Sequence, residues 1–417
     1  VIDAETKIPL VGVNIYIKNF QIGSTTDLEG KYKLNNVPIG LVSLTISYIG
    51  YESITKTDIS VKPNKTVFTD IEMSSSIIEM NEVVITNGYF SELENKPIST
   101  TNFSSEEIRR SPGTAGDVSR ILFTLPSVAK VNDQRNSLIV RGGTAVENSF
   151  YLDNIEIPNI NHFPVEGSSD GPIGILNADF IENVNFYSGS FSPIYGDRLS
   201  SIMEIGYREG NKTEFTPKIQ LNMAGVGGAI EGPIGKSGNY LFSFSRSYLD
   251  LILQQIEEGA PLPKYGDIQG KLIYNLDDKN RLTFLNVLSI DQIDMDQKKA
   301  IDNDANIYGT TNGTTNTAGI NWRRIWGESG YSNTSLSHTY TKFDRNYNNT
   351  VTLNEFYKNN TLENMIKIRN LNYLKLDNMN SIEFGVELQG IFTDYDTYYG
   401  EYKDQFGNLT PPINVDG

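Results

Sequence analysis

The side chains that could perform catalysis are few and poorly spaced in this chain of 417 residues. It contains two histidines, His162 and His338, and no cysteine, so disulfides, thiolate nucleophiles and cysteine metal sites are excluded. No Ser-His-Asp spacing, phosphate-binding loop or paired-histidine zinc motif accompanies them. The sequence therefore predicts a protein that is not an enzyme and that uses no cofactor.

An acidic segment offers the best candidate for a metal site, because hard cations bind clustered oxygen ligands. Its carboxylates are Asp291, Asp294, Asp296, Asp302 and Asp304. Asp302 and Asp304 begin like a calcium-binding loop, but Ile307 replaces the turn glycine and Gly313 stands where the bidentate glutamate belongs. We favour a solvated loop, so no metal is expected and these two aspartates are weak candidates.

Composition favours many strands over packed helices. Tyr and Phe are plentiful, and Gly, Asn, Ser and Thr are frequent, which suits strands and turns. The formal charge of −16 argues against nucleic acid as a partner, because phosphate binding needs a basic surface. No apolar run reaches the roughly 18 residues of a spanning helix. Val1 begins without a signal peptide, so we expect a processed or cut N-terminus.

Residues 1–73 are predicted to form a small β-sandwich. Apolar and polar positions alternate in short runs, as at Val11, Val13, Ile15 and Ile17, and turn residues separate the runs. Several short strands at this spacing are typical of a sandwich.

Four motifs in this segment resemble the carboxypeptidase-regulatory-like domain. They are Gly12-Val13-Asn14-Ile15, Gly23-Ser24-Thr25-Thr26-Asp27 with Gly30-Lys31-Tyr32, Pro38-Ile39-Gly40, and Tyr48-Ile49-Gly50-Tyr51. The resemblance implies a seven-stranded sandwich of the immunoglobulin or transthyretin type that is not a peptidase. Neither histidine lies in this segment to bind zinc, so we interpret it as an accessory binding module.

Residues 74–110 have the composition of a linker that contains one short strand. Its segment Glu82-Val83-Val84-Ile85-Thr86, extended to residue 87, resembles a TonB box, which implies binding to a TonB-type energy transducer in the periplasm. A short exposed strand can add to the edge of another sheet through main-chain hydrogen bonds. An ordinary linker strand is the alternative, and the position between two domains favours the box.

Residues 111–213 resemble the plug domain of TonB-dependent outer-membrane transporters, an α+β domain. Five motifs match it in order: Pro112-Gly113-Thr114-Ala115-Gly116-Asp117-Val118, Leu125-Pro126-Ser127-Val128, Leu138-Ile139-Val140-Arg141-Gly142-Gly143, Tyr151-Leu152-Asp153-Asn154-Ile155, and the run from Tyr195 to Ile205. Asp197 and Asn154 stand where the family often has glycine, and both residue types are accepted in turns.

The resemblance implies two groups of site residues. The first would hold or gate the plug, with Arg141 in an ion pair inside the plug or between plug and barrel. It comprises Arg141, Gly142, Gly143, Asp153 and Arg198. The second falls in the region that resembles the outward-facing apical loops, where ligand would first bind, although for His162 we favour a structural loop histidine. It comprises Asn159, Asn161, His162 and Phe163.

Residues 214–417 are predicted to form about eight strands of a transmembrane antiparallel β-barrel. The candidates are residues 217–231, 239–249, 266–275, 281–291, 316–326, 331–342, 365–376 and 381–393. In the last one, Ile382, Phe384, Val386 and Leu388 alternate with polar residues or glycine, which gives one wet and one apolar face. Short connections alternate with long polar ones at residues 250–265, 292–315 and 343–364, as in outer-membrane barrels.

The barrel is expected to be incomplete in this chain. Eight strands enclose a space that side chains just fill, whereas a plug of about 100 residues has a radius of gyration of about 13 Å. Plugged transporters use about 22 strands, so most of the barrel is expected beyond Gly417.

The sequence as a whole resembles a TonB-dependent receptor of the Bacteroidetes type, with an all-β-dominated fold. This implies active import across the outer membrane, with the sandwich in the periplasm. The implied partners are the transducer, a small-molecule, glycan or peptide ligand, outer-membrane lipid and a surface lipoprotein. The alternative is a cell-surface β-sandwich adhesin, which would have loops of equal length and strands facing one shared apolar core.

Overall fold

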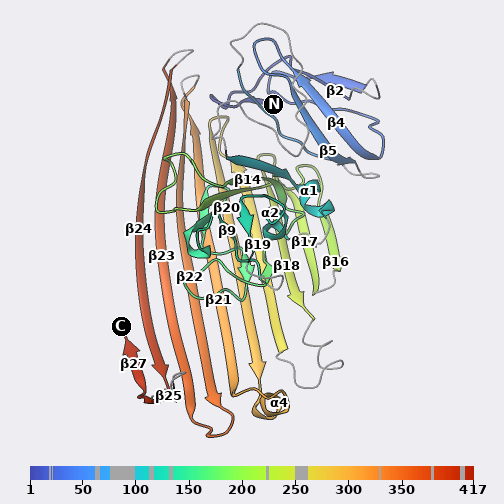
Figure 1. Cartoon of the computed structure of the whole chain (residues 1–417). Coiled ribbons are helices and arrows are strands. Elements are labelled where there is room, and N and C mark those ends of the chain that lie inside the picture. The colour runs from blue at the N-terminus through green and yellow to red at the C-terminus, as the bar shows by residue number, and fades with distance from the viewer. Residues whose placement is uncertain are drawn as a thin grey trace.

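The computed structural model describes residues 1–17, 20, 22–61, 66–75, 99–111, 117–130, 135–221, 225–248, 262–327, 330–376, 380–403 and 409–417. These residues form an N-terminal sandwich, a central domain and one large sheet (Figure 1). No helix among them is long and apolar enough to cross a membrane.

The N-terminal sandwich is built from two small sheets. A four-stranded sheet in the order β3-β2-β4-β5 contains β2 (Asn14–Ile17), β3 (Ile22–Thr25), β4 (Gly40–Ser47) and β5 (Ile54–Val61). The other sheet pairs β1 (Ile2–Asp3) with β6 (Glu72–Met73) in parallel. Val13, Ile15 and Ile17 are buried as the alternation predicts, and they form the core with Leu44 and Ile46.

The central domain is a mixed sheet with two short helices. Its strands, in the order β11-β10-β15-β14-β7, are β7 (Thr100–Ser104), β10 (Asn148–Leu152), β11 (Ile155–Ile157), β14 (Ile181–Tyr187) and β15 (Ser201–Tyr207). Helix α1 (Ser105–Arg110) begins at a capping box of Ser104 and Glu107, and Asp117 caps helix α2 (Val118–Leu122). Strand β7 and helix α1 lie within residues 74–110, so this domain begins earlier than the sequence analysis assumed.

Smaller elements complete the central domain. Strand β8 (Val128–Ala129) pairs with β9 (Ile139–Val140), and β12 (Asn161–His162) pairs with β13 (Ile173–Gly174). The 3-10 helix η1 (Ala145–Glu147) precedes β10.

The large sheet is antiparallel, and each strand up to β24 pairs with the next one along the chain. It contains β16 (Thr216–Leu221), β17 (Gly225–Ile234), β18 (Gly238–Ser247), β19 (Leu262–Asn275), β20 (Asn280–Met295), β21 (Ile307–Ile325), β22 (Gly330–Asn349), β23 (Glu355–Lys375), β24 (Ser381–Tyr399) and β27 (Ile413–Asp416). Helix α4 (Gln297–Asp302) and the pair of β25 (Tyr402–Lys403) with β26 (Leu409–Thr410) lie between strands.

Two expectations about this sheet were wrong. The predicted strand 217–231 is a pair of strands, β16 and β17, and two of the predicted long loops are mostly strand. Between β20 and β21 only residues 296–306 remain as a connection, and between β22 and β23 only residues 350–354. Segments such as Thr310-Thr311-Asn312 are polar at successive positions, so alternation fails there although threonine favours strands.

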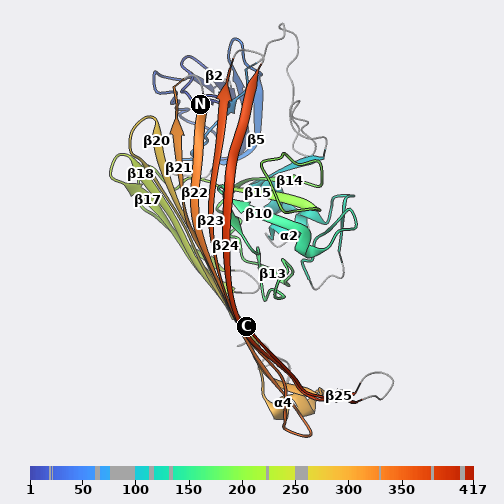
Figure 2. The ribbon, with the colours of Figure 1, turned by 90° about the vertical axis from the view of Figure 1, so that its left-hand side faces the viewer.

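The two faces of the large sheet are opposite in character, as alternation predicted. The outer face exposes large apolar side chains, among them Phe244, Ile320, Leu336, Ile368 and Val386. The inner face buries polar and charged side chains against the central domain, including Asp267, Gln269, Lys271, Lys367 and Arg369. Figure 2 shows the sheet edge-on, with the central domain on one face. The fold class is thus confirmed as a sandwich, an α+β domain and the start of a barrel wall that does not close on itself.

The central domain and the inner face share one apolar core. Ala229, Leu241, Leu285 and Val287 of β17, β18 and β20 belong to the same buried cluster as the sheet and helices of the central domain. The sandwich lies at the end of the sheet where short turns join the strands, and α4 lies at the opposite end (Figure 1).

Candidate functional site at the inner face of the sheet

A tight hairpin brings the central domain onto three strands of the large sheet. Asp153 and Asn154 link β10 to β11, with φ angles of 48° and 69°. Two positive φ angles define a mirror-image turn, which Asp and Asn accept. Lys271 on β19 lies 3.0 Å from the Asp153 carboxylate. Asn154 accepts a hydrogen bond of 2.6 Å from Arg369 on β23 and donates one of 3.3 Å to Asn321 on β21.

A second contact buries a charge next to this hairpin. Glu156, on β11, accepts a hydrogen bond of 2.8 Å from the Ser149 hydroxyl and pairs with Arg198 at 2.9 Å. Its other carboxylate oxygen meets the ammonium of Lys367 on β23. The Glu156 and Lys367 side chains are 7% and 6% exposed, so this ion pair is almost fully desolvated. Arg198 therefore takes part in an ion pair within the central domain, and Glu156 carries the contact to the sheet.

The charges continue into strand β24. Glu387 lies 2.6 Å from Lys367 and 3.3 Å from the Arg369 guanidinium. That guanidinium stacks over the rings of Tyr151 and Tyr195, with centroid distances of 4.6 and 5.1 Å. Positive and negative groups thus alternate from Arg198 to Arg369 across the interface.

Burial raises the pKa of the Glu156 carboxyl, but the nearby Lys367 ammonium and the Arg198 guanidinium outweigh it and hold the pKa below its usual value. Glu156 is therefore ionised at neutral pH. Removing one member of such a pair leaves a buried charge without its partner, which is strongly destabilising. We call the residues Glu156, Arg198, Lys367, Arg369 and Glu387 the charged lock.

His162 forms another contact between the domain and the sheet. Its Nδ1 lies 2.7 Å from Asp291 on β20, and its Nε2 lies 3.6 Å from Asp267 on β19. The ring packs on Tyr265 with a centroid distance of 4.5 Å and is 1% exposed. Burial lowers the pKa of His162, but the two carboxylates outweigh it and raise the pKa above its ordinary value.

The other predicted ligand contacts are also drawn inward. Asn159 and Asn161 are buried, and the Asn159 side chain accepts hydrogen bonds from the Asn161 backbone and side chain at 2.9 and 3.3 Å. Phe163 is half-buried and meets the Tyr265 ring edge-on. Asn159, Asn161 and His162 are therefore buried in this conformation: the two asparagines pair inside the central domain, and His162 pairs with the sheet, as a structural histidine would.

Arg141 does not make the expected ion pair. It has a φ of 50° and precedes Gly142 with a φ of 81°, so both residues adopt the left-handed conformation. Its guanidinium donates a hydrogen bond of 2.9 Å to Ser99, and no carboxylate among the described residues lies within ion-pair distance. Gly143 packs directly against Ser200, so a Cβ there would overlap that side chain.

The predicted metal site lies at the end of helix α4. Asp302 ends α4 and Asp304 follows with a φ of 53°, and the described residues contain no group of three metal-ligating side chains. The TonB-box-like residues 82–86 lie outside the described residues.

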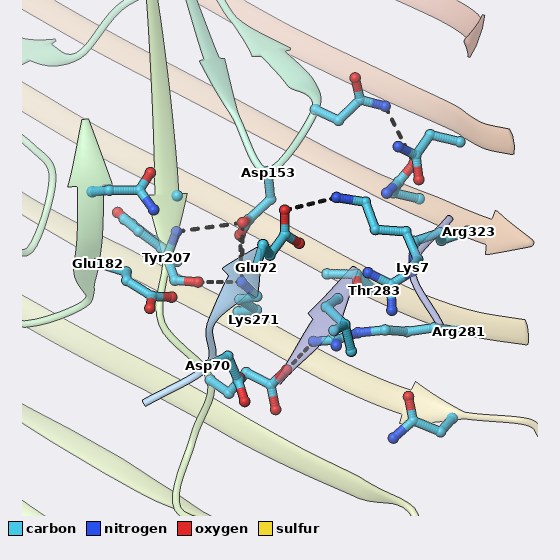
Figure 3. A pocket seen from close by; sticks show the side chains of 18 of the residues that line it. Lys7, Asp70, Glu72, Asp153, Glu182, Tyr207, Lys271, Arg281, Thr283 and Arg323 are labelled. Carbon is cyan, nitrogen blue, oxygen red and sulfur yellow. Dashed lines mark hydrogen bonds and ion pairs between the residues drawn. The ribbon is translucent and has the colours of Figure 1, made fainter. Parts of the chain in front are cut away.

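A polar cavity of about 480 Å³ lies between the sandwich, the central domain and the large sheet. Figure 3 shows charged side chains from all three parts around it. Glu72 and Lys7 come from the sandwich, Asp153 from the central domain, and Arg281 and Arg323 from the large sheet.

Comparisons with known proteins agree with this arrangement. A family model described as the CarboxypepD_reg-like domain matches residues 1–85, and one described as the TonB-dependent Receptor Plug Domain matches residues 92–201. The chain is 24% identical over 242 residues to the TonB-dependent transporter Oar of Myxococcus xanthus, with 56% of this chain and 22% of that protein covered. Residues 92–201 thus match the plug domain of TonB-dependent receptors. A second relative, the TonB-dependent receptor P39 of Formosa agariphila, is 35% identical over 81 residues, which cover 19% of this chain and 7% of that receptor.

Solved structures of low sequence identity share the fold of this chain. The siderophore receptor PirA from Acinetobacter baumannii is 14% identical with a TM-score of 0.53, over 72% of this chain and 48% of that one. The copper transporter OprC is 10% identical with a TM-score of 0.51, over 75% and 49%. The chain thus spans about half the length of these structures. The central domain is the plug, the large sheet is the start of the barrel wall, and both indicate an outer-membrane protein.

Of the charged lock, the sequence predicts Arg198 as a site residue and none of the other four members. Lys367 and Arg369 did leave a signal, because they alternate with the apolar Ile366 and Ile368 along one strand. That pattern indicates charges on the inner face of the barrel. Glu156 lies between Ile155 and Ile157, and nothing in the sequence pairs it with a lysine 211 residues away.

Proposed function

We propose that the protein imports a ligand across the outer membrane, with the plug as a gate that the periplasmic energy transducer opens. One observation carries this proposal. The plug rests on the polar inner face of a sheet whose outer face is apolar, as expected for a lipid-facing barrel wall around a plugged lumen. A plug in this position must stay in place when no force acts on it and must be able to move when the transducer pulls on it.

The charged lock and the His162 contact suit such a gate. Among the residues that the structure describes, strand β23 contributes none to the apolar core that the plug shares with β17, β18 and β20, so on β23 the ion pairs of the charged lock can be exchanged for water one after another. Glu156–Lys367 and His162–Asp291 hold the plug to β23 and β20, on separate strands of the wall. Opening therefore requires both contacts to break, which keeps the resting state closed.

The transducer would bind residues 82–86 by strand addition. The first plug strand after that segment, β7, is an edge strand whose one sheet neighbour is β14. A pull from the N-terminal side would therefore act on an edge of the plug sheet, where few hydrogen bonds resist it.

Binding of the transducer can be measured before any ligand is known. The probe is the purified periplasmic C-terminal domain of the transducer, tested by calorimetry against the full-length receptor and a variant lacking residues 82–87. We expect saturable binding that the deletion abolishes. Equal binding to both proteins would reject this segment as the transducer site.

The orientation is proposed from the loop lengths and the position of the sandwich. Short turns and the sandwich would face the periplasm, and α4 would face outside. A protease tag inserted after Asn303 is expected to be cleaved on intact cells, while a tag in the sandwich is protected. Equal cleavage of both tags would favour the surface-adhesin alternative and end the proposal of import.

The ligand class is left as a small molecule, a glycan or a peptide. Structures named for siderophores and for copper share this fold with the chain, so the fold is not tied to one ligand. Phe163, which is half-buried beside Tyr265, is the best of the predicted ligand contacts, because the other three are buried in the resting plug.

A further inference from the structure

The N-terminal sandwich rests on the plug and the barrel through charged side chains. Glu5 pairs with Lys375 at 3.0 Å, Lys56 with Glu182 at 3.1 Å, and Asp70 with Lys212 at 3.7 Å. Lys7 and Lys212 add cation–π contacts with Tyr331 and Phe68 at 5.3 and 5.8 Å. Within the described part of the chain, the buried apolar cluster of the sandwich includes no residue of the plug or barrel.

These contacts make the joint separable. All three ion pairs have side chains that are partly exposed, and exposed pairs of this kind shift an equilibrium by up to about fivefold each. No apolar surface of the sandwich core has to be uncovered when the sandwich leaves. The sandwich can therefore dissociate from the barrel while both remain folded.

The sandwich contacts two different parts of the molecule, the barrel wall and the plug. Lys375 and Tyr331 lie at the ends of β23 and β22, on the rim of the barrel wall. Glu182 lies on β14, inside the plug sheet and next to Asn183, which pairs with Ser104 on β7. One side of the joint is therefore fixed to the wall, and the other follows the plug.

The sandwich also forms one wall of the polar cavity in Figure 3. It contributes Val1, Ile2, Lys7, Asp70, Ile71 and Glu72. Residues of the plug and the barrel line the remainder, among them Asp153, Tyr207, Arg281 and Arg323. A ligand that passes the plug on this side enters a space that the sandwich bounds on one side.

We propose that the sandwich is a detachable periplasmic door over this cavity. The ion pair of Glu5 with Lys375 attaches it to the barrel rim, and the ion pair of Lys56 with Glu182 attaches it to the plug. Movement of β14 breaks the plug contact, weakens the joint and opens the cavity toward the periplasm. This inference rests on the proposed import function, because it assigns the sandwich to the exit side of the same route.

The test measures access to the cavity and needs no ligand. The chain has no cysteine, so Asn333→Cys, at a half-buried position that lines the cavity, gives one reporter thiol in the full-length protein. A small charged methanethiosulfonate reagent is applied from the periplasmic side of outer membranes. Lys236→Cys, in an exposed short turn at the same end, is the matched control for reagent access.

Charge reversals separate the two halves of the joint. Lys375→Glu and Glu182→Lys should each speed labelling of the reporter about fivefold. The charge swaps Lys375→Glu with Glu5→Lys, and Glu182→Lys with Lys56→Glu, should restore slow labelling. Restoration by the swap shows that the effect of each single variant comes from the lost ion pair. The control thiol should react at one rate throughout.

Fast labelling of the reporter thiol without any charge reversal would refute the proposal that the sandwich closes the cavity. If Lys375→Glu speeds labelling and Glu182→Lys does not, the plug contact does not control the position of the sandwich. Failure of the import proposal gives a different signature. The transducer domain would then not bind, whereas labelling of the reporter would still respond to both charge reversals.

Discussion

Neutralising the charged lock should loosen the plug by a measurable free energy. In Glu156→Gln the amide keeps the size of the side chain but leaves Lys367 and Arg198 without its charge. Removing one partner of a buried ion pair typically costs about 3–5 kcal/mol. We expect the lower end of that range, because Lys367 keeps a second carboxylate, Glu387, at 2.6 Å. About 3 kcal/mol corresponds to a roughly 150-fold increase in the open fraction of the plug.

Hydrogen exchange of plug amides in the purified full-length receptor measures that fraction. Lys367→Met replaces the other partner with an apolar side chain of similar length, and the double variant completes a mutant cycle. Because the two groups touch, the double variant should lose less than the sum of the single variants, by about 1–3 kcal/mol. If the losses in the free energy of plug opening are strictly additive, Glu156 and Lys367 do not interact across the interface. The charged lock would then not hold the plug closed.

Three further changes test other parts of the interface. The pKa of His162 is raised in the folded protein, so the stability that its charged form contributes is complete below about pH 6.5 and is lost as the pH rises through the raised pKa. The melting temperature of the protein should therefore fall over that pH window. His162→Gln should remove this pH dependence. Gly143→Ala should lower stability by about 1–3 kcal/mol in urea unfolding, because its Cβ would lie 2.8 Å from the Ser200 Cβ, whereas Gly196→Ala, with nothing within 4 Å, should be neutral. Addition of Ca²⁺ or of a chelator should leave the melting temperature unchanged, and a shift that Asp302→Asn removes would establish the calcium site we consider weak.

The sequence predicts the faces of the barrel strands well, because an outer-membrane strand has one strict rule. Ile366 and Ile368 must meet lipid while Lys367 and Arg369 turn inward, and alternation reveals this without tertiary information. The rule stops where the strands continue as polar segments. Residues 310–315 of β21 have no apolar side chain on either face, so only the pairing with β20 and β22 makes them strand.

The site was less predictable, because polarity was taken to indicate exposure. His162 and Asn161 are polar, yet each is buried beside a partner from another segment, Asp291 for one and Asn136 for the other. Burial of a polar group depends on whether it finds a partner, and the partner of His162 lies 129 residues away. Local sequence patterns carry no information about contacts of that kind.

The shared core of plug and wall has a consequence for biogenesis. Leu241, Leu285 and Val287 point inward from the wall and complete the apolar cluster of the plug, so neither part covers its own apolar surface. A plug that folded before the barrel wall formed would expose this apolar surface to water. We therefore expect the plug to reach its final packing only while the strands assemble around it, and an assembly factor that inserts the wall would then also finish the folding of the gate.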